Sequence, residues 1–230
     1  MSYLVEILIE IIAGIIAGII AGNGAVYVFN QIPLNWLTKE EVNNQGELKA
    51  EDGQRVKSYP WKWVFTMFFI GGGIKLFTED WIYGLAAFAA SWALLEIGLA
   101  DKKYNTLPNP FIILLAICAF GFIPYQKNPL DCLYGALLGG GAMAIVVIIE
   151  KAAGKGKYIK WSHAKLFTVM GFCFGLYGTG IALTLTISIT LGVFLVGVIR
   201  KKLIKDQPKP FGTFIGAAGI IYLVIIWPLL

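Results

Sequence analysis

The sequence predicts an all-α fold, a polytopic integral membrane bundle of about eight transmembrane helices. Of its residues, 57% are hydrophobic and only 14% are charged, and the mean hydropathy is +0.72. A soluble globular domain carries about 25% charged residues, so this chain has too few charges for a surface that faces water. In lipid its long apolar segments must be helical, because an open strand would leave backbone groups unpaired. We therefore expect residues 1–230 to form a single membrane domain.

Eight apolar segments define the expected helices. They lie at approximately 4–29, 61–77, 81–99, 110–123, 130–149, 165–177, 179–199 and 211–230. A full span needs roughly 20 apolar residues. Several segments are shorter, which a bundle tolerates where helix ends are buried in protein. No basic stretch precedes the first apolar run, so we expect a retained helix and not a cleaved signal peptide.

The first segment contains the repeat Ile-Ile-Ala-Gly three times between residues 11 and 22. The four-residue spacing places Gly14, Gly18 and Gly22 along one helix face, where small residues allow a neighbouring helix to approach closely. Packing against another helix of the same chain is favoured over a dimer seam.

Basic residues collect in alternate connections. They are Lys39, Lys49, Arg55 and Lys57 in the first, Lys102 and Lys103 in the third, Lys151, Lys155, Lys157 and Lys160 in the fifth, and Arg200, Lys201, Lys202, Lys205 and Lys209 in the seventh. The other connections are an acidic 78–80, 125–129 with only Lys127, and a turn at Gly178. With eight spans the basic loops share one face, which the positive-inside rule places in the cytoplasm with both termini outside. The net charge of +5 is then a signal of topology, and no nucleic-acid partner is expected. The longest loop, 30–60, is of mixed charge and is expected on the cytoplasmic side.

Ionisable residues inside spans or at their ends are the candidates for chemistry, because charge is costly in lipid. The candidates are Glu6, Glu10, Glu96, Asp101, Asp131, Glu150 and His163. Glu6 and Glu150 lie near span ends and can reach water. Asp131 opens a helix, where the positive end of the helix dipole stabilises a carboxylate. Glu10 and Glu96 lie deeper in their spans. For each, three roles stay open: a member of a buried pair, a ligand or a proton carrier.

Asp101 and His163 share the expected cytoplasmic face. A carboxylate and an imidazole together can perform acid–base chemistry at neutral pH, and a purely structural pair is an equal alternative. The three cysteines form no CxxC pair, so neither a zinc site nor a disulfide frame is indicated, and no metal or cofactor is expected.

The stretch from Asp101 to Asn109 reads Asp-Lys-Lys-Tyr-Asn-Thr-Leu-Pro-Asn after an apolar helix. It resembles the first active-site block of the type IV prepilin peptidases, bacterial membrane-embedded aspartic proteases of the GxGD type. Further segments resemble other blocks of that family in the same order. They are 22–33 ending in Gln-Ile-Pro, Tyr59-Pro60, 131–136, Lys165-Leu166 before Gly171, and 209–212 reading Lys-Pro-Phe-Gly.

The resemblance implies an endopeptidase of the bacterial inner membrane that removes basic leader peptides from prepilins at the cytoplasmic face. The family uses two aspartates, one charged and one protonated. Asp101 matches the first aspartate. The second belongs to a Gly-x-Gly-Asp motif, but here 160–163 read Lys-Trp-Ser-His, so His163 takes the place of the aspartate. The family's glutamate after Tyr-Pro is also absent. The four-cysteine motif of many members is absent too, and this second absence argues against amino-terminal methylation with S-adenosylmethionine.

Three functions follow as alternatives. The first is a divergent prepilin leader peptidase centred on Asp101 and His163. The second is a catalytically inactive relative that acts as a binding or assembly partner in a pilus or secretion system. The third is a small-solute transporter with Glu10 or Glu96 along its path. The expected partners are the lipid bilayer and, for the peptidase, a prepilin-like peptide, and the sequence specifies no oligomeric state.

Overall fold

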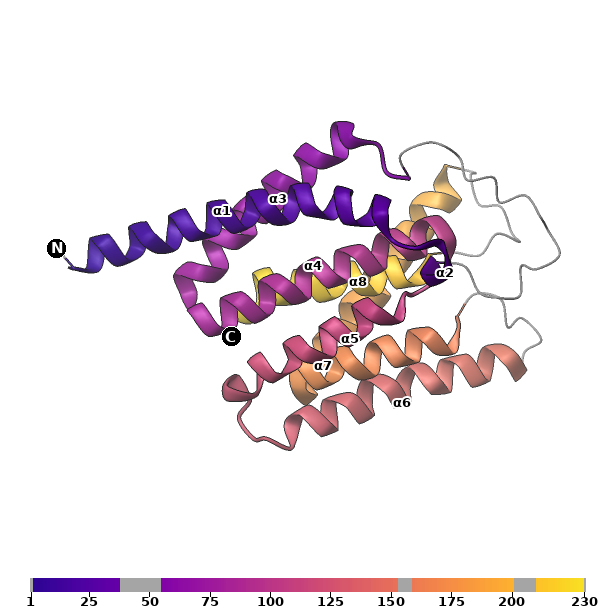
Figure 1. Ribbon diagram of the computed structural model, residues 1–230. Coiled ribbons are helices and arrows are strands. Elements are labelled where there is room, and N and C mark those ends of the chain that lie inside the picture. The colour runs from indigo at the N-terminus through magenta and orange to yellow at the C-terminus, as the bar shows by residue number, and fades with distance from the viewer. Residues whose placement is uncertain (1, 38–54, 153–158, 201–209, 230) are drawn as a thin grey trace.

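The structure is a computed structural model, and it describes residues 2–37, 55–152, 159–200 and 210–229. Within these ranges the chain is helical and contains no strand (Figure 1). The α-helices are α1 (Ser2–Gln31), α2 (Leu34–Leu37), α3 (Ser58–Glu79), α4 (Trp81–Tyr104), α5 (Asn109–Cys118), α6 (Asp131–Ala152), α7 (Trp161–Ile199) and α8 (Phe211–Ile221). Short 3-10 turns, Ala119–Gly121 (η2) and Ile123–Tyr125 (η3), follow α5, and a π-helical turn, Tyr222–Ile226 (η4), and a 3-10 turn, Trp227–Leu229 (η5), follow α8. The expected all-helical class is confirmed.

The expected count of about eight spans is not confirmed. Within the described ranges, four helices are long and apolar enough to cross a membrane, namely α1, α4, α6 and α7. The helix α5 has 10 residues, which rise about 15 Å against a hydrocarbon core of about 30 Å. It and the segment 211–226 are shorter apolar helices and are not among the four candidate spans.

The glycine repeat of α1 packs against α3, as expected from its spacing. A Cβ atom added at Gly14 would lie 2.6 Å from the backbone nitrogen of Ile74, and one at Gly18 would lie 2.5 Å from Cα of Ile70. Gly22 likewise abuts the backbone of Thr66. Because only glycine lets the two backbones approach this closely, the prediction of packing within one chain is confirmed.

The long helix α7 changes direction at Gly175, whose φ of 69° lies in the region that favours glycine. Residues on both sides of this break reach the same glycine of α6. A Cβ atom at Gly139 would lie 2.5 Å from the carbonyl oxygen of Phe167 and 3.2 Å from Cγ2 of Thr179. The expected turn at Gly178 is therefore corrected to Gly175, where the side chain of Gln126 lies against the backbone and donates to the carbonyl of Cys173 at 3.1 Å.

Several basic helix ends meet at one end of the bundle. The Nζ atom of Lys103 donates to the carbonyl of Arg55 at 2.5 Å, which joins the end of α4 to the residues before α3. The ammonium of Lys151, at the end of α6, lies 5.6 Å from the ring centroid of Trp161, at the start of α7. The two chain termini lie toward the opposite end of the bundle (Figure 1). Most of the expected cytoplasmic loop 30–60 lies outside the described residues, although α1 continues to Gln31, beyond the expected helix end.

Candidate functional site

The end of α4 and the start of α7 bring Asp101 and His163 together. Both side chains are buried, each with 1% of its surface exposed. Oδ1 of Asp101 lies 3.8 Å from Nε2 of His163. A carboxylate and an imidazole from distant parts of the sequence thus face each other at the end of the bundle where the basic helix ends meet.

The first turn of α8 holds the carboxylate of Asp101. The backbone N–H of Thr213 donates to Oδ2 at 3.1 Å, and the Thr213 hydroxyl donates to the carbonyl of Gly98 at 2.8 Å. A helix amino terminus offers unpaired N–H groups and a positive dipole end, both of which favour a carboxylate. Gly212 makes this approach possible, because a Cβ atom there would lie 2.9 Å from Cγ of Asp101 and 2.6 Å from Cδ2 of Leu107.

The imidazole of His163 is oriented by the residue that precedes α7. The backbone N–H of Lys160 donates to Nδ1 at 2.9 Å. Because Nδ1 accepts this hydrogen bond, a neutral imidazole carries its proton on Nε2, the nitrogen that faces Asp101. The edge of the imidazole also meets the ring of Phe211, with centroids 5.6 Å apart, so α8 contacts both members of the pair.

A capping contact ties the two helix ends to each other. Asn105 ends α4 in the left-handed conformation, with φ of 52°, and its N–H donates to the carbonyl of Asp101 at 2.8 Å. The Nζ atom of Lys160 donates to the carbonyl of Asn105 at 2.7 Å. Lys160 therefore joins the two helix ends, through its backbone N–H to His163 and through its ammonium to Asn105.

The two side chains lie close together but form no direct hydrogen bond. The distance of 3.8 Å exceeds the 2.7–3.2 Å of an N–H···O hydrogen bond. Within the described residues, neither Oδ1 of Asp101 nor Nε2 of His163 has a hydrogen-bond partner. An acceptor and a donor thus face each other in a buried position without a hydrogen bond between them.

The other ionisable candidates lie apart from this pair. Glu96, on the same helix as Asp101, is fully buried, and in the part of the chain that the structure describes its carboxyl oxygens have no hydrogen-bond partner. Glu10 and Asp131 are half-buried and Glu6 is exposed. Glu150 accepts a hydrogen bond from the N–H of Ile159 at 2.8 Å. Among the described residues no group of three or more His, Cys, Asp or Glu side chains could hold a metal ion.

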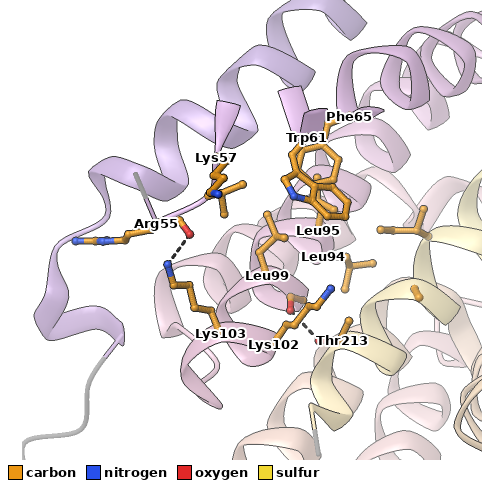
Figure 2. A pocket seen from close by; sticks show the side chains of 14 residues that line it. Arg55, Lys57, Trp61, Phe65, Leu94, Leu95, Leu99, Lys102, Lys103 and Thr213 are labelled. Carbon is orange, nitrogen blue, oxygen red and sulfur yellow. Dashed lines mark hydrogen bonds between the residues drawn. The ribbon is translucent and has the colours of Figure 1, made fainter. Parts of the chain in front are cut away.

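Sequence reasoning missed the contribution of α8. The Lys-Pro-Phe-Gly segment indicates only a resemblance to a family block, and nothing local to it predicts that the N–H of Thr213 reaches Asp101. A cavity of about 500 Å³ beside Thr213 was also missed (Figure 2). Its walls come from α3, α4 and α8 and from the residues just before α3.

The fold and this pair define a helical membrane protein with a buried carboxylate–imidazole centre at one end of its bundle. The chain is similar to a protein of Bacillus subtilis (strain 168) named prepilin leader peptidase/N-methyltransferase, with 27% identity over 133 residues. The match covers 56% of this chain and 50% of that relative, so the chain spans about half the length of the relative it matches. No model of a known protein family and no solved structure matches the chain.

Proposed function

We propose that the chain is a membrane endopeptidase of the prepilin leader peptidase kind, which cleaves the basic leader peptides of pilin-like precursors. The observation that carries this proposal is the buried juxtaposition of Asp101 and His163, with one oxygen and one nitrogen 3.8 Å apart and, among the described residues, without a hydrogen-bond partner. The partial similarity to a prepilin leader peptidase supports it. We place the reaction at the cytoplasmic face of a bacterial inner membrane, because the helix ends around the pair are basic.

In the proposed chemistry the two groups have the same two roles as the carboxyl groups of an aspartic pair. Such a pair needs one carboxylate that accepts a proton and one protonated group that donates a hydrogen bond. Here Asp101 is the acceptor, and the Nε2–H of His163 is the donor. In the first step the oxygen of a water molecule attacks the scissile carbonyl carbon, Oδ1 of Asp101 takes the proton of that water, and the Nε2–H stabilises the developing oxyanion. The C–N bond then breaks, and the proton held by Asp101 passes to the leaving amine.

A cleavage assay tests this proposal. The purified protein is incubated in detergent with a prepilin that carries its basic leader, and leader removal is followed by mass spectrometry. We expect Asp101→Asn and His163→Gln each to lower the rate by about 10²–10⁴-fold, the usual contribution of a positioned acid or base. Asp131→Asn, which removes a carboxylate at the start of α6, serves as the matched control and should leave the rate unchanged. A substrate that stays intact with the unaltered protein, while a working prepilin peptidase cleaves it, would refute the proposal.

A non-proteolytic binding or assembly partner of a pilus or secretion system is the second candidate. The observation that favours it is the burial of both side chains, together with Lys160 and Ser162 standing where the resembled motif has glycines. Binding of the same prepilin, measured by fluorescence anisotropy of a labelled leader, separates the two functions. Binding without cleavage supports the second, whereas cleavage that disappears with Asp101→Asn supports the first.

A further inference from the structure

The cavity beside the candidate site lies between the start of α3, the end of α4 and the start of α8 (Figure 2). Its volume is about 500 Å³. Thr213 belongs both to its wall and to the hydrogen bonds of Asp101. The cavity itself is separate from the carboxylate–imidazole pair, because neither Asp101 nor His163 lines it.

One end of the cavity is cationic. Its lining includes four basic side chains and, among the described residues, no acidic one; the basic residues are Arg55, Lys57, Lys102 and Lys103. The ammonium of Lys103 and the guanidinium of Arg55 donate to backbone carbonyl groups, which carry no full charge. Within the described residues none of the four forms an ion pair with a carboxylate. The cavity mouth therefore favours an anion.

The other end of the cavity is apolar. From Lys102 back to Leu95 is seven residues along α4, or about 10 Å at 1.5 Å per residue. Leu94, Ala217 and Ile220 line the same deeper part, where Thr213 contributes a hydroxyl group. Its hydroxyl is already bonded to the carbonyl of Gly98 (Figure 2). A polar ligand segment at this depth would lose its hydrogen bonds to water without gaining others.

Aromatic side chains mark the depth of the mouth in the membrane. Trp61 lines the cavity, with 42% of its surface exposed, and the nearby Trp63 is 61% exposed. Tryptophan is enriched at the level of lipid headgroups. The ammonium of Lys102 lies 5.7 Å from the ring centroid of Trp61. The cavity thus has cations at the level of the lipid headgroups and an apolar part below them. A phospholipid has the complementary arrangement, with an anionic phosphate above an acyl chain.

We infer that this cavity binds one anionic phospholipid, with the headgroup between Lys57 and Lys102 and an acyl chain along Phe65, Leu95 and Ala217. The inference stands apart from the proposed peptidase function. A basic leader peptide is an unsuitable occupant because the lysine ammonium groups of the lining repel it. An acidic peptide is less suitable than a lipid because its backbone would be left without hydrogen-bond partners at the apolar end.

Native mass spectrometry of the delipidated protein in detergent tests this site. The protein is titrated with phosphatidylglycerol and, separately, with phosphatidylcholine of the same acyl chains. We expect one phosphatidylglycerol to bind about tenfold or more tightly than phosphatidylcholine, since each cation near an anionic headgroup contributes measurably. The double substitution Lys57→Gln with Lys102→Gln should bring the ratio close to one. Lys75→Gln with Lys127→Gln, which removes the same charge outside the cavity, should keep the ratio.

A second variant tests the apolar end. Ala217→Phe should weaken the binding of both lipids by a similar factor, because it fills the slot without changing the charge. Three results would overturn the inference: an equal loss of preference in the Lys75 and Lys127 control, competition by free glycerol 1-phosphate as strong as that by the lipid, or displacement of the lipid by a short acidic peptide. The second would indicate a site for soluble anions, and the third a peptide site.

Discussion

Gly212 and Thr213 determine how Asp101 is held. The absence of a side chain at Gly212 lets α8 come against the carboxylate, and the next N–H, that of Thr213, then reaches Oδ2 at 3.1 Å. On the opposite side, the N–H of Lys160 fixes the tautomer of His163. The site thus depends on backbone N–H groups placed by helix starts, and not only on the two side chains that the sequence singles out.

Substitution at Gly212 tests this dependence. Gly212→Ala should lower the free energy of unfolding by about 1–3 kcal/mol, because the new methyl group would overlap Leu107 and Asp101. Thermal unfolding in detergent measures the effect. Gly141→Ala is the matched control, since a Cβ atom there meets nothing within 4 Å; it should be neutral or stabilising by about 0.5–1 kcal/mol. Equal unfolding temperatures for the two variants would contradict the packing described for Gly212.

The start of α4 shows how a loop carboxylate fixes a helix. Oδ1 of Asp80 accepts a hydrogen bond from the N–H of Tyr83 at 2.8 Å and another from the hydroxyl of Tyr125. The hydrogen bond from Tyr125, followed by that from the Tyr83 backbone, lowers the pKa of Asp80 below its ordinary value of 3.8. The cap thereby joins α4 to the turn after α5.

The contribution of Asp80 to stability should depend on pH. Because the pKa is lower in the folded state, the stabilisation is complete above pH 3.8 and is lost as the pH falls through the folded-state pKa. Asp80→Asn keeps a capping oxygen but removes the charge. We expect this variant to unfold at a lower temperature than the unaltered protein at pH 6, and the difference to shrink as the pH is lowered below 3.8. The adjacent Glu79→Gln should show no such pH-dependent difference; if it behaves identically, the effect is not due to the cap.

The pairing of α1 with α3 rests on backbone contact. Gly18→Leu should separate the two helices and destabilise the protein by about 1–3 kcal/mol or more, because the side chain would meet the backbone of Ile70. Gly24→Leu on the same helix is the control, since nothing lies within 4 Å of a Cβ atom there. The two unfolding temperatures provide the measurement. A Gly18 variant as stable as the Gly24 variant would show that the close approach is not needed.

At the scale of the whole molecule, the distribution of basic residues distinguishes the two ends of the bundle. One end carries the basic residues around Asp101 and His163, joined by the contacts of Lys103 with Arg55 and of Lys160 with Asn105. Lys127 lies in the loop before α6. The positive-inside rule predicts that the basic end faces the cytoplasm.

Cysteine labelling in cells tests this orientation. In a background without the native cysteines, Lys127→Cys should react with a membrane-impermeant maleimide added to intact cells. Lys57→Cys and Lys103→Cys should react only after the membrane is permeabilised. The reverse pattern would invert the predicted orientation and place the candidate site on the outer face.

Local chemistry was enough for the sequence to determine the class of fold. The deficit of charge required a membrane environment, lipid required helices, and the spacing of Gly14, Gly18 and Gly22 predicted a close helix contact. The sequence also singled out Asp101 and His163 separately. Ionisable side chains at span ends cost free energy in a membrane, and a functional role can explain why they are there.

Only the tertiary structure decided how these parts combine. It moved the turn within α7 from Gly178 to Gly175, left the expected count of about eight spans unconfirmed, with four candidate spans in the described part of the chain, and placed Thr213 against Asp101. The physical reason is that hydropathy and helical periodicity are properties of neighbours in the chain. Which helix end meets which depends on side-chain packing and chain reversals between segments far apart in sequence, and that is where the pair and its adjoining cavity arise.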